Sequence, residues 1–422
     1  MNNFSDLSKA LTDTLDSQIQ KKEGIFFTPY RAVIQILDIV EKIGVGKNIL
    51  EPSCGSGQFL DYLTTRYPEA YKTGIEYNPD IFAKISQKYN SSGSKGIRLI
   101  NQDFLTWNGI DDSKFDLIIG NPPFYVMKKK DVPPSFQNDQ EKIGLVVGRP
   151  NIFILFIIHS LTLLRENGVL AFVLPKNFLN CLYYDPVRKL IKKSCKIIAI
   201  REAEGEYLKT SQDTIITVFQ RCPTESECLA HNKKWCWSPL DYPCTIMMPD
   251  NILQEIETLL SGSTTLDKLG VNVSVGSVVW NEHKDILSKS PESDKYKTRL
   301  IYSSEIKDGS LIAPVSYSNT QKGNYIDLEG WNDTIIVVNR GYGVGKYSFQ
   351  YALVDKEKVG SDYLIENHLI YLRQKESGEN LLFEKILASF NRETTKKFIK
   401  LYFGNNAINV TELQHIFPIW LD

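Results

Sequence analysis

The sequence has little of several features that would mark particular classes of protein. Its 422 residues carry 49 Lys and Arg against 50 Asp and Glu, so no excess of charge indicates a polycation. The longest apolar run, residues 152–158, is far below the roughly 20 residues that a membrane-spanning helix needs. The N-terminus shows no basic stretch followed by an apolar core, so we expect no signal peptide and no membrane contact. We therefore expect a cytoplasmic protein of two or three domains.

Cysteine and histidine are scarce as well, with seven and five residues. Four of the cysteines lie close to one another and to His231, but none of their spacings is the short gap of common zinc-binding motifs. These are Cys222, Cys228, Cys236 and Cys244. We expect reduced thiols and no metal; a metal site in this segment is the weaker alternative.

Residues 25–220 alternate between segments of strand and helix character. Apolar runs of strand length lie at 48–50, 72–76, 97–100, 115–119, 169–174, 196–200 and 214–219. Periodic segments of helical length lie at 30–43, 57–66, 79–89 and 151–165. Such alternation predicts an α/β fold with a doubly wound, mostly parallel sheet of seven strands that is covered on both faces.

The remainder of the chain has a different character. Residues 221–249 hold four cysteines and four prolines with little periodicity, which favours a linker. Beyond it, strands are expected at 271–280 and 334–339 and helices at 381–389 and 394–403, a mixture typical of an α+β domain with mostly antiparallel strands. The predicted organisation is an N-terminal extension (1–23), a sheet domain (24–220), the linker (221–249) and a second domain (250–422).

A glycine turn follows the first predicted strand. Gly55 and Gly57 let the backbone approach a ligand closely at the carboxyl end of the strand. Leu60 replaces the third glycine of a dinucleotide motif, and no phosphate-binding Gly-Lys-Ser/Thr is present, so the turn suits a nucleoside without a pyrophosphate. Glu76, 19 residues after Gly57, is placed to accept hydrogen bonds from ribose hydroxyls. A plain structural turn is the alternative.

The next two strand ends carry further polar and aromatic residues. Asp103 could accept a hydrogen bond from an adenine amino group, and Phe104 could pack on the ring. Each acid alone could be an ordinary surface residue, but three successive strand ends of this kind favour a nucleoside site.

The motif Asn121-Pro122-Pro123-Phe124 follows the fourth strand. Two prolines fix the backbone and end strand pairing, since neither has an N–H to donate. The turn would expose the Asn121 side-chain oxygen and the Pro122 carbonyl as paired acceptors, with Phe124 available to stack on a planar group. These residues predict a site for a planar amine.

Together these segments resemble the gamma-class adenine-N6 DNA methyltransferases of type II restriction–modification systems, which use S-adenosylmethionine. The resemblance includes Phe26-Phe27-Thr28-Pro29 before the glycine turn and the order Glu51 to Gly57, Glu76, Asp103 and Asn121 to Phe124. It covers residues 24–220 well and the later region more loosely. There, residues 404–411 and 416–419 resemble the target-recognition domains of these enzymes.

The resemblance implies a role for each motif residue. The methionine part of the cofactor would contact Thr28, Glu51 and the turn from Gly55 to Gly57, the ribose would contact Glu76, and the adenine would contact Asp103, Phe104 and Pro123. Asn121 and Pro122 would hold the target amine of an adenine flipped out of duplex DNA, and Phe124 would stack on it. Tyr207 is the candidate for a second stacking aromatic, with Leu208 as the other possible aligned position.

Other expectations concern contacts with DNA and with partners. The long polar segment 125–150 would close over the DNA, and its lysines would contact phosphates; a flexible surface loop is the alternative. In the second domain a Gly-rich turn could contact phosphates or bases, or be a simple hairpin. The residues concerned are Lys128, Lys129, Lys130, Arg340 and Lys346. We expect a monomer, with any cognate restriction endonuclease on a separate chain.

Two other classes of function stay open at this point. Methyltransferases that act on protein glutamine or on ribosomal RNA guanine share the Asn-Pro-Pro-aromatic motif. A sequence-specific DNA-binding protein with a decayed catalytic core is the other alternative, although intact Gly55, Gly57, Asn121 and Phe124 speak against it.

Overall fold

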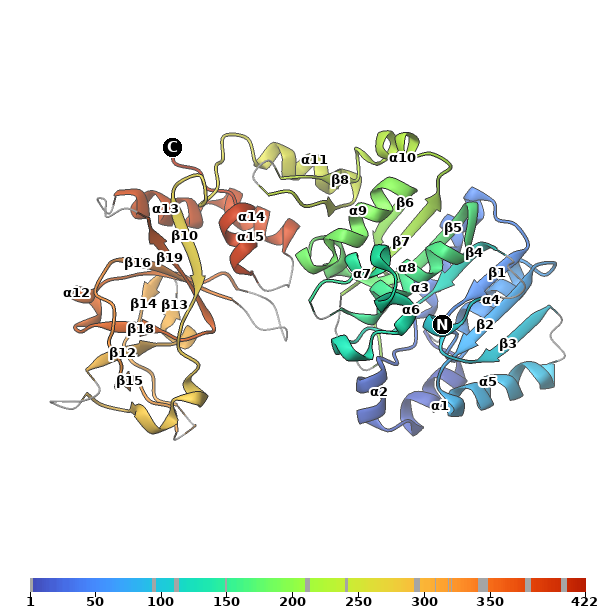
Figure 1. Cartoon of the computed structure of the whole chain (residues 1–422), viewed down its shortest axis with the longest axis horizontal. Coiled ribbons are helices and arrows are strands. Elements are labelled where there is room, and N and C mark those ends of the chain that lie inside the picture. Colours follow the sequence, from blue (N-terminus) through green and yellow to red (C-terminus); the bar gives the residue numbers. More distant parts are fainter. Residues whose placement is uncertain are drawn as a thin grey trace. The chain divides into compact units, whose positions relative to one another are not determined.

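The computed structural model describes residues 3–92, 96–109, 114–148, 150–208, 213–239, 242–291, 297–307, 309–317, 319, 321–340, 348–375, 381–403 and 408–422. The chain divides into two compact units (Figure 1). The first unit comprises Met1–Ser238 and Cys244–Leu253, and the second comprises Pro239–Pro243 and Gln254–Asp422. No helix among the described residues is both long and apolar enough to span a membrane.

The first unit contains a seven-stranded sheet with helices between its strands. Its helices are α1 (Asp6–Thr14), α2 (Ser17–Glu23), α3 (Tyr30–Ile43), α4 (Gln58–Arg66), α5 (Pro79–Ser92), α6 (Pro134–Gln137), α7 (Gln140–Gly144), α8 (Ile152–Leu163), α9 (Asp185–Ser194) and α10 (Glu225–Asn232). Its strands are β1 (Asn48–Glu51), β2 (Tyr71–Glu76), β3 (Ile97–Asn101), β4 (Phe115–Gly120), β5 (Leu164–Pro175), β6 (Cys195–Glu202) and β7 (Thr214–Arg221), with the short pair β8 (Cys236–Trp237) and β9 (Ile246–Met247).

The strand order of the large sheet is β3-β2-β1-β4-β5-β7-β6. The strands β3, β2, β1, β4 and β5 are mutually parallel, and β7 is antiparallel to both β5 and β6. The order reverses direction at β1 and β4, where an open α/β sheet binds its ligand. The predicted doubly wound, mostly parallel sheet is confirmed.

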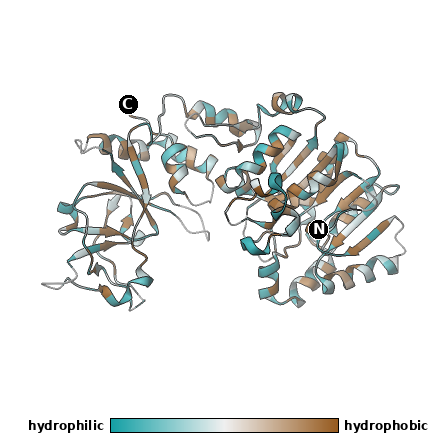
Figure 2. Ribbon diagram, in the orientation of Figure 1, coloured by the Kyte–Doolittle hydropathy of each residue, from teal (hydrophilic) through white to brown (hydrophobic). Residues whose placement is uncertain are grey.

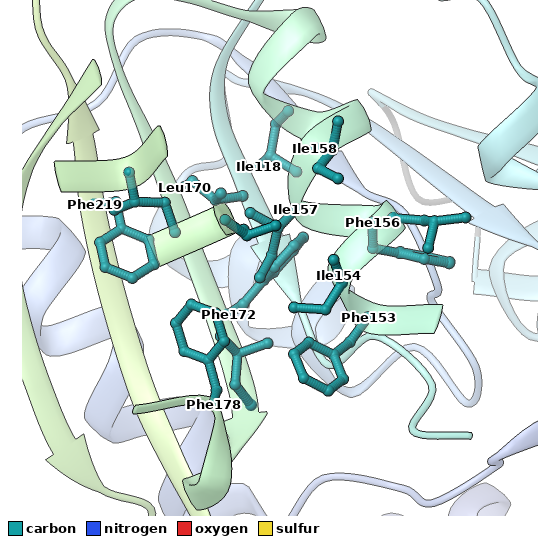
Figure 3. Packing of buried hydrophobic residues seen from close by; sticks show 14 of the residues in the cluster. Ile118, Phe153, Ile154, Phe156, Ile157, Ile158, Leu170, Phe172, Phe178 and Phe219 are labelled. Carbon is teal, nitrogen blue, oxygen red and sulfur yellow. The ribbon is translucent and has the colours of Figure 1, made fainter. Parts of the chain in front are cut away.

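Both faces of this sheet are buried, and alternate residues of a strand belong to different cores. In β5, Leu170 and Phe172 pack with the apolar helix α8, while Ala171 and Val173 pack with α3 and α4 on the other face. Figure 3 shows the α8 side, where Phe153 and Ile157 lie against Phe172 and its neighbours. Helix α8 is apolar on almost every side, and ten of its twelve residues are buried.

Two segments differ from the prediction. Residues 221–249 were expected to be a linker; here α10 packs on α9 and β6, and β8 pairs antiparallel with β9 in the first unit, whereas Pro239–Pro243 belongs to the second unit. The segment 125–150 was expected to be a long polar loop. It contains α6 and α7 and is fixed to the core because Val132 and Phe136 are buried and Met127 N donates to Pro150 O at 2.8 Å. In both cases a few apolar side chains among many polar ones provide the anchoring.

The cysteine prediction was also wrong at one pair. Cys222 and Cys228 form a disulfide, because Cys222 follows β7 directly and Cys228 lies on the first turns of α10, with their Cα atoms 6.3 Å apart. His231 bonds through Nε2 to the Ile197 carbonyl at 3.0 Å. Within the described residues, no group of three or more His, Cys, Asp or Glu could hold a metal ion.

The second unit is built on two four-stranded sheets, mostly antiparallel as predicted. One has the order β10-β19-β16-β17 and the other β11-β15-β12-β18. The strands are β10 (Val271–Val275), β11 (Leu287–Ser288), β12 (Thr298–Ile301), β13 (Ile306–Lys307), β14 (Ser310–Leu311), β15 (Tyr325–Ile326), β16 (Ile335–Asn339), β17 (Tyr351–Val354), β18 (Tyr363–Ile365) and β19 (Leu369–Gln374). The helices are α12 (Lys356–Val359), α13 (Leu381–Asn391), α14 (Glu393–Tyr402) and α15 (Val410–His415); α11 (Asp250–Leu259) crosses the boundary between the units.

Strand β10 is shorter than the predicted strand 271–280. It ends before Gly276, whose missing side chain is required because a Cβ there would lie 2.2 Å from the Glu366 carbonyl oxygen. In Figure 2 the strands of both units are largely hydrophobic, whereas many helices show one hydrophobic and one hydrophilic side. This pattern agrees with strands in the core and helices at the surface.

Candidate active site

The carboxyl ends of four neighbouring strands gather at one cavity of about 560 Å³ in the first unit. Glu51 ends β1, Glu76 ends β2, Asp103 follows β3 and Asn121 follows β4, and all four line the cavity. Five more of the sequence-predicted site residues line it too: Thr28, Gly55, Phe104, Pro123 and Lys128. Gly57 does not, although Gly55 and Ser56 before it do. The predicted strand-end residues are therefore brought together.

The glycine turn is held by Glu76. Gly55 and Gly57 have φ angles of 50° and 78°, which side chains rarely adopt, and a Cβ on Gly57 would lie 2.7 Å from the Tyr89 hydroxyl. Gly55 N donates to Glu76 Oε2 at 2.8 Å, and Asn78 N donates to Glu76 Oε1 at 2.8 Å. One carboxylate thus connects the turn after β1 with the end of β2.

The cavity wall is acidic. Burial raises the pKa of Glu51 well above its ordinary value, and Asp61 and Glu76 raise it further. Burial also raises the pKa of Glu76 to about 7, although hydrogen bonds from Asn78 N and Gly55 N oppose the shift. Glu51 Oε2 is buried and has no hydrogen-bond partner among the described residues. A buried carboxylate without a positive partner is costly, so this wall suits a cationic ligand.

The end of β3 supplies one polar and one aromatic residue. Asp103 Oδ1 accepts from Leu105 N at 2.9 Å, which fixes the side chain at the start of a short helical turn. Phe104 is almost fully buried, with its ring 4.9 Å from that of Phe156, and part of it still lines the cavity. Phe104 is therefore both a core residue and a wall of the site.

The Asn-Pro-Pro-Phe turn is rigidly held. Asn121 Nδ2 donates to the Phe26 carbonyl at 3.2 Å, and Ser53 Oγ donates to the Asn121 carbonyl at 3.1 Å. Asn121 Oδ1 is buried and accepts no hydrogen bond from any described residue. With the amide nitrogen already engaged, Asn121 presents an unused acceptor at the cavity.

The two aromatic candidates occupy different surroundings. Phe124 does not line the cavity; its ring lies 6.0 Å from Phe153, edge to face. Gly24 lies against the backbone of Phe124, where a Cβ would approach its nitrogen to 2.8 Å. Tyr207 also lies outside the cavity wall; Thr214 Oγ1 donates to its hydroxyl at 3.4 Å, and burial raises its pKa to about 12.

The predicted DNA-contact residues are partly described. Lys128 lines the cavity, and Lys129 and Lys130 are exposed at the following turn. Arg340 lies after β16, where its Nη1 donates to the Asn367 carbonyl at 3.4 Å. Lys346 lies outside the described residues.

Comparisons with known proteins agree with this geometry. Residues 27–207 match the family model described as Eco57I restriction-modification methylase. The chain is 29% identical to type II methyltransferase M.CvrRI of Paramecium bursaria Chlorella virus XZ-6E over 98% of each chain. It is 25% identical to modification methylase CviBIII of Paramecium bursaria Chlorella virus NC1A, over 98% of this chain and 99% of the relative. The chain is a methyltransferase that uses S-adenosylmethionine, and it is similar to the type II restriction–modification methylases.

One solved structure shares the fold of this methyltransferase over nearly its whole length. The cryo-electron microscopy structure of a DrdV–DNA complex superposes with a TM-score of 0.53 at 12% identity, over 96% of this chain and 57% of that chain. At this identity the likeness shows the fold alone. It agrees with a seven-stranded sheet followed by further sheets in one chain.

The cavity fits the methyl donor. S-adenosylmethionine carries sulfonium and ammonium charges, which the buried carboxylates of Glu51 and Glu76 would complement. When bound, it supplies an electrophilic methyl group. The sequence-based expectation of this cofactor is confirmed, whereas the role of each lining residue stays a prediction.

The methyltransferase has site residues that the sequence analysis did not find. Lys22 and Glu23, counted in the N-terminal extension, line the cavity, and Glu23 Oε2 accepts from Asn78 Nδ2 at 3.1 Å. Tyr77 and Tyr125 line it as well. Tyr77 directly follows Glu76 and is 64% exposed, so an aromatic next to the predicted ribose ligand was the signal available in the sequence.

Proposed function

We propose that this methyltransferase transfers a methyl group from S-adenosylmethionine to N6 of an adenine that is flipped out of duplex DNA, as the modification enzyme of a restriction–modification system. The observation that carries the proposal is the unused Oδ1 acceptor of Asn121, held in place because Nδ2 donates to the Phe26 carbonyl at 3.2 Å. A neutral acceptor in a rigid turn is what an exocyclic amine requires.

The chemistry follows from what an aromatic amine lacks. Its lone pair is delocalised into the ring, so the nitrogen is a poor nucleophile. Asn121 Oδ1 and the Pro122 carbonyl would accept both N–H bonds and favour a pyramidal nitrogen with its lone pair directed toward the methyl group. The barrier would then be lowered by positioning and by fixed dipoles. The carbon–sulfur bond to the methyl group would break as the nitrogen–carbon bond forms, and the surplus amine proton would pass to water.

The substrate must leave the base stack to reach a cavity at the ends of buried strands. Phe124, three residues after Asn121, remains our candidate for one stacking surface, beside the cavity wall and not within it, and Tyr207 remains our candidate for a second. Lys128, Lys129 and Lys130 would contact phosphates near the opening of the cavity. In this proposal the first unit carries the chemistry and the second recognises the DNA target, in a monomeric cytoplasmic protein with any cognate endonuclease on a separate chain.

The decisive experiment is transfer of labelled methyl from S-adenosylmethionine to unmethylated duplex DNA, followed by nucleoside analysis. We expect all label in N6-methyladenine. Label in N4-methylcytosine would overturn the choice of base. Label absent from DNA, with the cofactor still bound, would redirect the search to protein glutamine and ribosomal RNA guanine. Failure to bind the cofactor would indicate a decayed core that binds DNA only.

A further inference from the structure

The second unit contains a lysine enclosed by three aromatic rings. Lys322 Nζ lies 4.4 Å from the ring centre of Tyr302, 4.7 Å from that of Tyr317 and 5.2 Å from that of Trp280. Tyr302 follows β12, Trp280 begins a turn after β10, and Tyr317 and Lys322 precede β15. We call these three rings the lysine cage. Each ring face attracts the ammonium group, so the side chain is held in one place.

Hydrogen bonds fix the two tyrosine rings of the cage. The Tyr317 hydroxyl donates to Glu305 Oε1 at 2.9 Å, and Glu305 Oε2 pairs with Arg299 at 2.6 Å. Both charged side chains of this pair are buried. The Tyr302 hydroxyl donates to the Gly323 carbonyl at 2.9 Å, next to Lys322 in the chain. The cage is therefore fixed before any ligand arrives.

Other cationic side chains lie near the caged lysine. Arg340 Nη1 donates to the Asn367 carbonyl at 3.4 Å, and Asn367 N donates to the carbonyl of Val278, two residues before Trp280, at 2.9 Å, so Arg340 is bonded to the segment that lies beside the cage. Arg340 and Lys322 both lower the pKa of His368 in this segment, after the larger effect of burial. His368 also bonds to Glu366, a buried carboxylate that accepts from His368 N at 3.0 Å. Lys284 also contacts the cage, because its Nζ lies 5.9 Å from the Trp280 ring centre.

These cations outnumber the carboxylate near them. Burial raises the pKa of Glu366, whereas the hydrogen bond from His368 N and the charge of Lys322 oppose the shift. Across the parts of the chain that the structure describes, neither Lys322 nor Lys284 nor Arg340 forms an ion pair, although many lysines elsewhere in the chain do. Lys322 and Arg340 are partly exposed and Lys284 is exposed. One buried carboxylate leaves this cluster with an excess of positive charge, which a bound anion would offset.

We propose that Lys322 and Arg340 form a phosphate-binding site of the second unit that binds the sugar–phosphate backbone of the DNA substrate, with Lys284 adding a further positive charge. The inference rests on the proposed function, since it takes duplex DNA as the substrate. The converging charges fit an anion better than a base edge, which offers separate donors and acceptors. The cage removes the cost of ordering a lysine side chain on binding, so a single contact contributes more.

The test is the salt dependence of DNA binding. Affinity for a labelled duplex of random sequence is measured by anisotropy at several KCl concentrations. Each lost phosphate contact reduces the slope of log affinity against log salt by about 0.9 and weakens binding on the order of tenfold at moderate salt. We expect this of Lys322→Gln and of Arg340→Gln, and a roughly doubled loss of slope in the double variant. Lys322→Arg keeps the positive charge, so its slope should equal that of the wild type.

The matched control is Lys358→Gln. It removes the same charge from the same unit, but Lys358 already pairs with Asp355 at 3.5 Å, so its slope should equal that of the wild type. An equal loss of slope in the control would overturn the proposal, because it would show an effect of net charge alone. Loss of affinity for one cognate sequence, with unchanged binding to random DNA, would overturn it in favour of base reading.

The cage has its own test. Trp280→Leu opens one side and keeps the charge, so affinity should fall severalfold while the slope stays at the wild-type value. If the Trp280 ring had a purely structural role, a variant that a melting curve shows to be folded would keep both the wild-type affinity and the wild-type slope. The proposed function fails separately: wild-type protein that neither binds nor methylates DNA refutes it, whereas methylation by a Lys322→Gln variant with unchanged affinity and slope refutes only the phosphate site.

Discussion

The two units place their polar sites in different ways. In the first unit, Glu51, Glu76, Asp103 and Asn121 each stand at or directly after the carboxyl end of a strand of one sheet, and they share a cavity. In the second unit, the residues around Lys322 come from turns between short strands of two sheets. Parallel strands bring their carboxyl ends to a common edge, so spacing along the chain predicts the first site. No such rule exists for turns between antiparallel strands.

The largest effect should come from the strand-end site. Asn121→Ala removes the unused acceptor while the backbone turn is kept by Pro122 and Pro123. We expect turnover to fall on the order of 100- to 1,000-fold, as for other fixed polar groups at a reacting centre. Cofactor affinity, measured by calorimetry, should stay within a few-fold of wild type. Equal loss of affinity and turnover would contradict the role, and Asn90→Ala on the surface of α5 serves as the control.

The sequence predicted the first site and its sheet well because both depend on local patterns. Helix α3 spans residues 30–43 as predicted, and all seven strands lie where the apolar runs indicated. The prediction failed where long-range packing decides. Nothing in the spacing shows that the segment 221–249 packs on α9, that Glu23 reaches Asn78, or that Lys322 lies among three rings.

The second unit should be the more fragile where its site is supported. Arg299→Leu leaves the Glu305 carboxylate buried without its partner, which costs about 3–5 kcal/mol in comparable cases. Chemical denaturation should then show an early transition of the second unit, while cofactor binding by the first unit persists. Lys356→Ala, which breaks an exposed pair with Asp362, should cost no more than about 1 kcal/mol. A single transition that also abolishes cofactor binding would show that the units do not unfold independently.

Acidity should affect the first site through Glu76. Its pKa is raised to about 7, so the carboxylate is mostly protonated at pH 6 and mostly ionised at pH 8. Because the ionised form suits ribose hydroxyls and a cationic cofactor, affinity should fall about tenfold between pH 8 and pH 6. Glu76→Gln should bind weakly with a reduced pH dependence, whereas Asp103→Asn should keep the wild-type dependence. An unchanged affinity in Glu76→Gln would refute the ribose role.

The same shift has the opposite consequence for folding. A carboxyl whose pKa is higher in the folded state than in the unfolded state binds more protons when folded. Its contribution to stability is therefore lost as pH rises from about 4.5 through about 7. Melting curves without cofactor should show this loss, and added S-adenosylmethionine should offset it above pH 7. Above about pH 7 the ionised Glu76 therefore lowers the stability of the unliganded protein while it favours binding of the cofactor.

The smallest effect should come from a contact between the N-terminal helix α1 and the glycine turn, which tests whether the strand ends alone define the first site. Ser8 of α1 is fully buried, and its Oγ lies 2.7 Å from Ser56 Oγ and 2.6 Å from Gln58 Oε1, at the glycine turn. Ser8→Ala should cost about 1 kcal/mol of stability, and the exposed Ser17→Ala should cost less. If cofactor affinity falls with Ser8→Ala, the N-terminal helices help to shape the turn, and this site too depends on contacts that spacing does not reveal. If only stability falls, the strand ends alone define it.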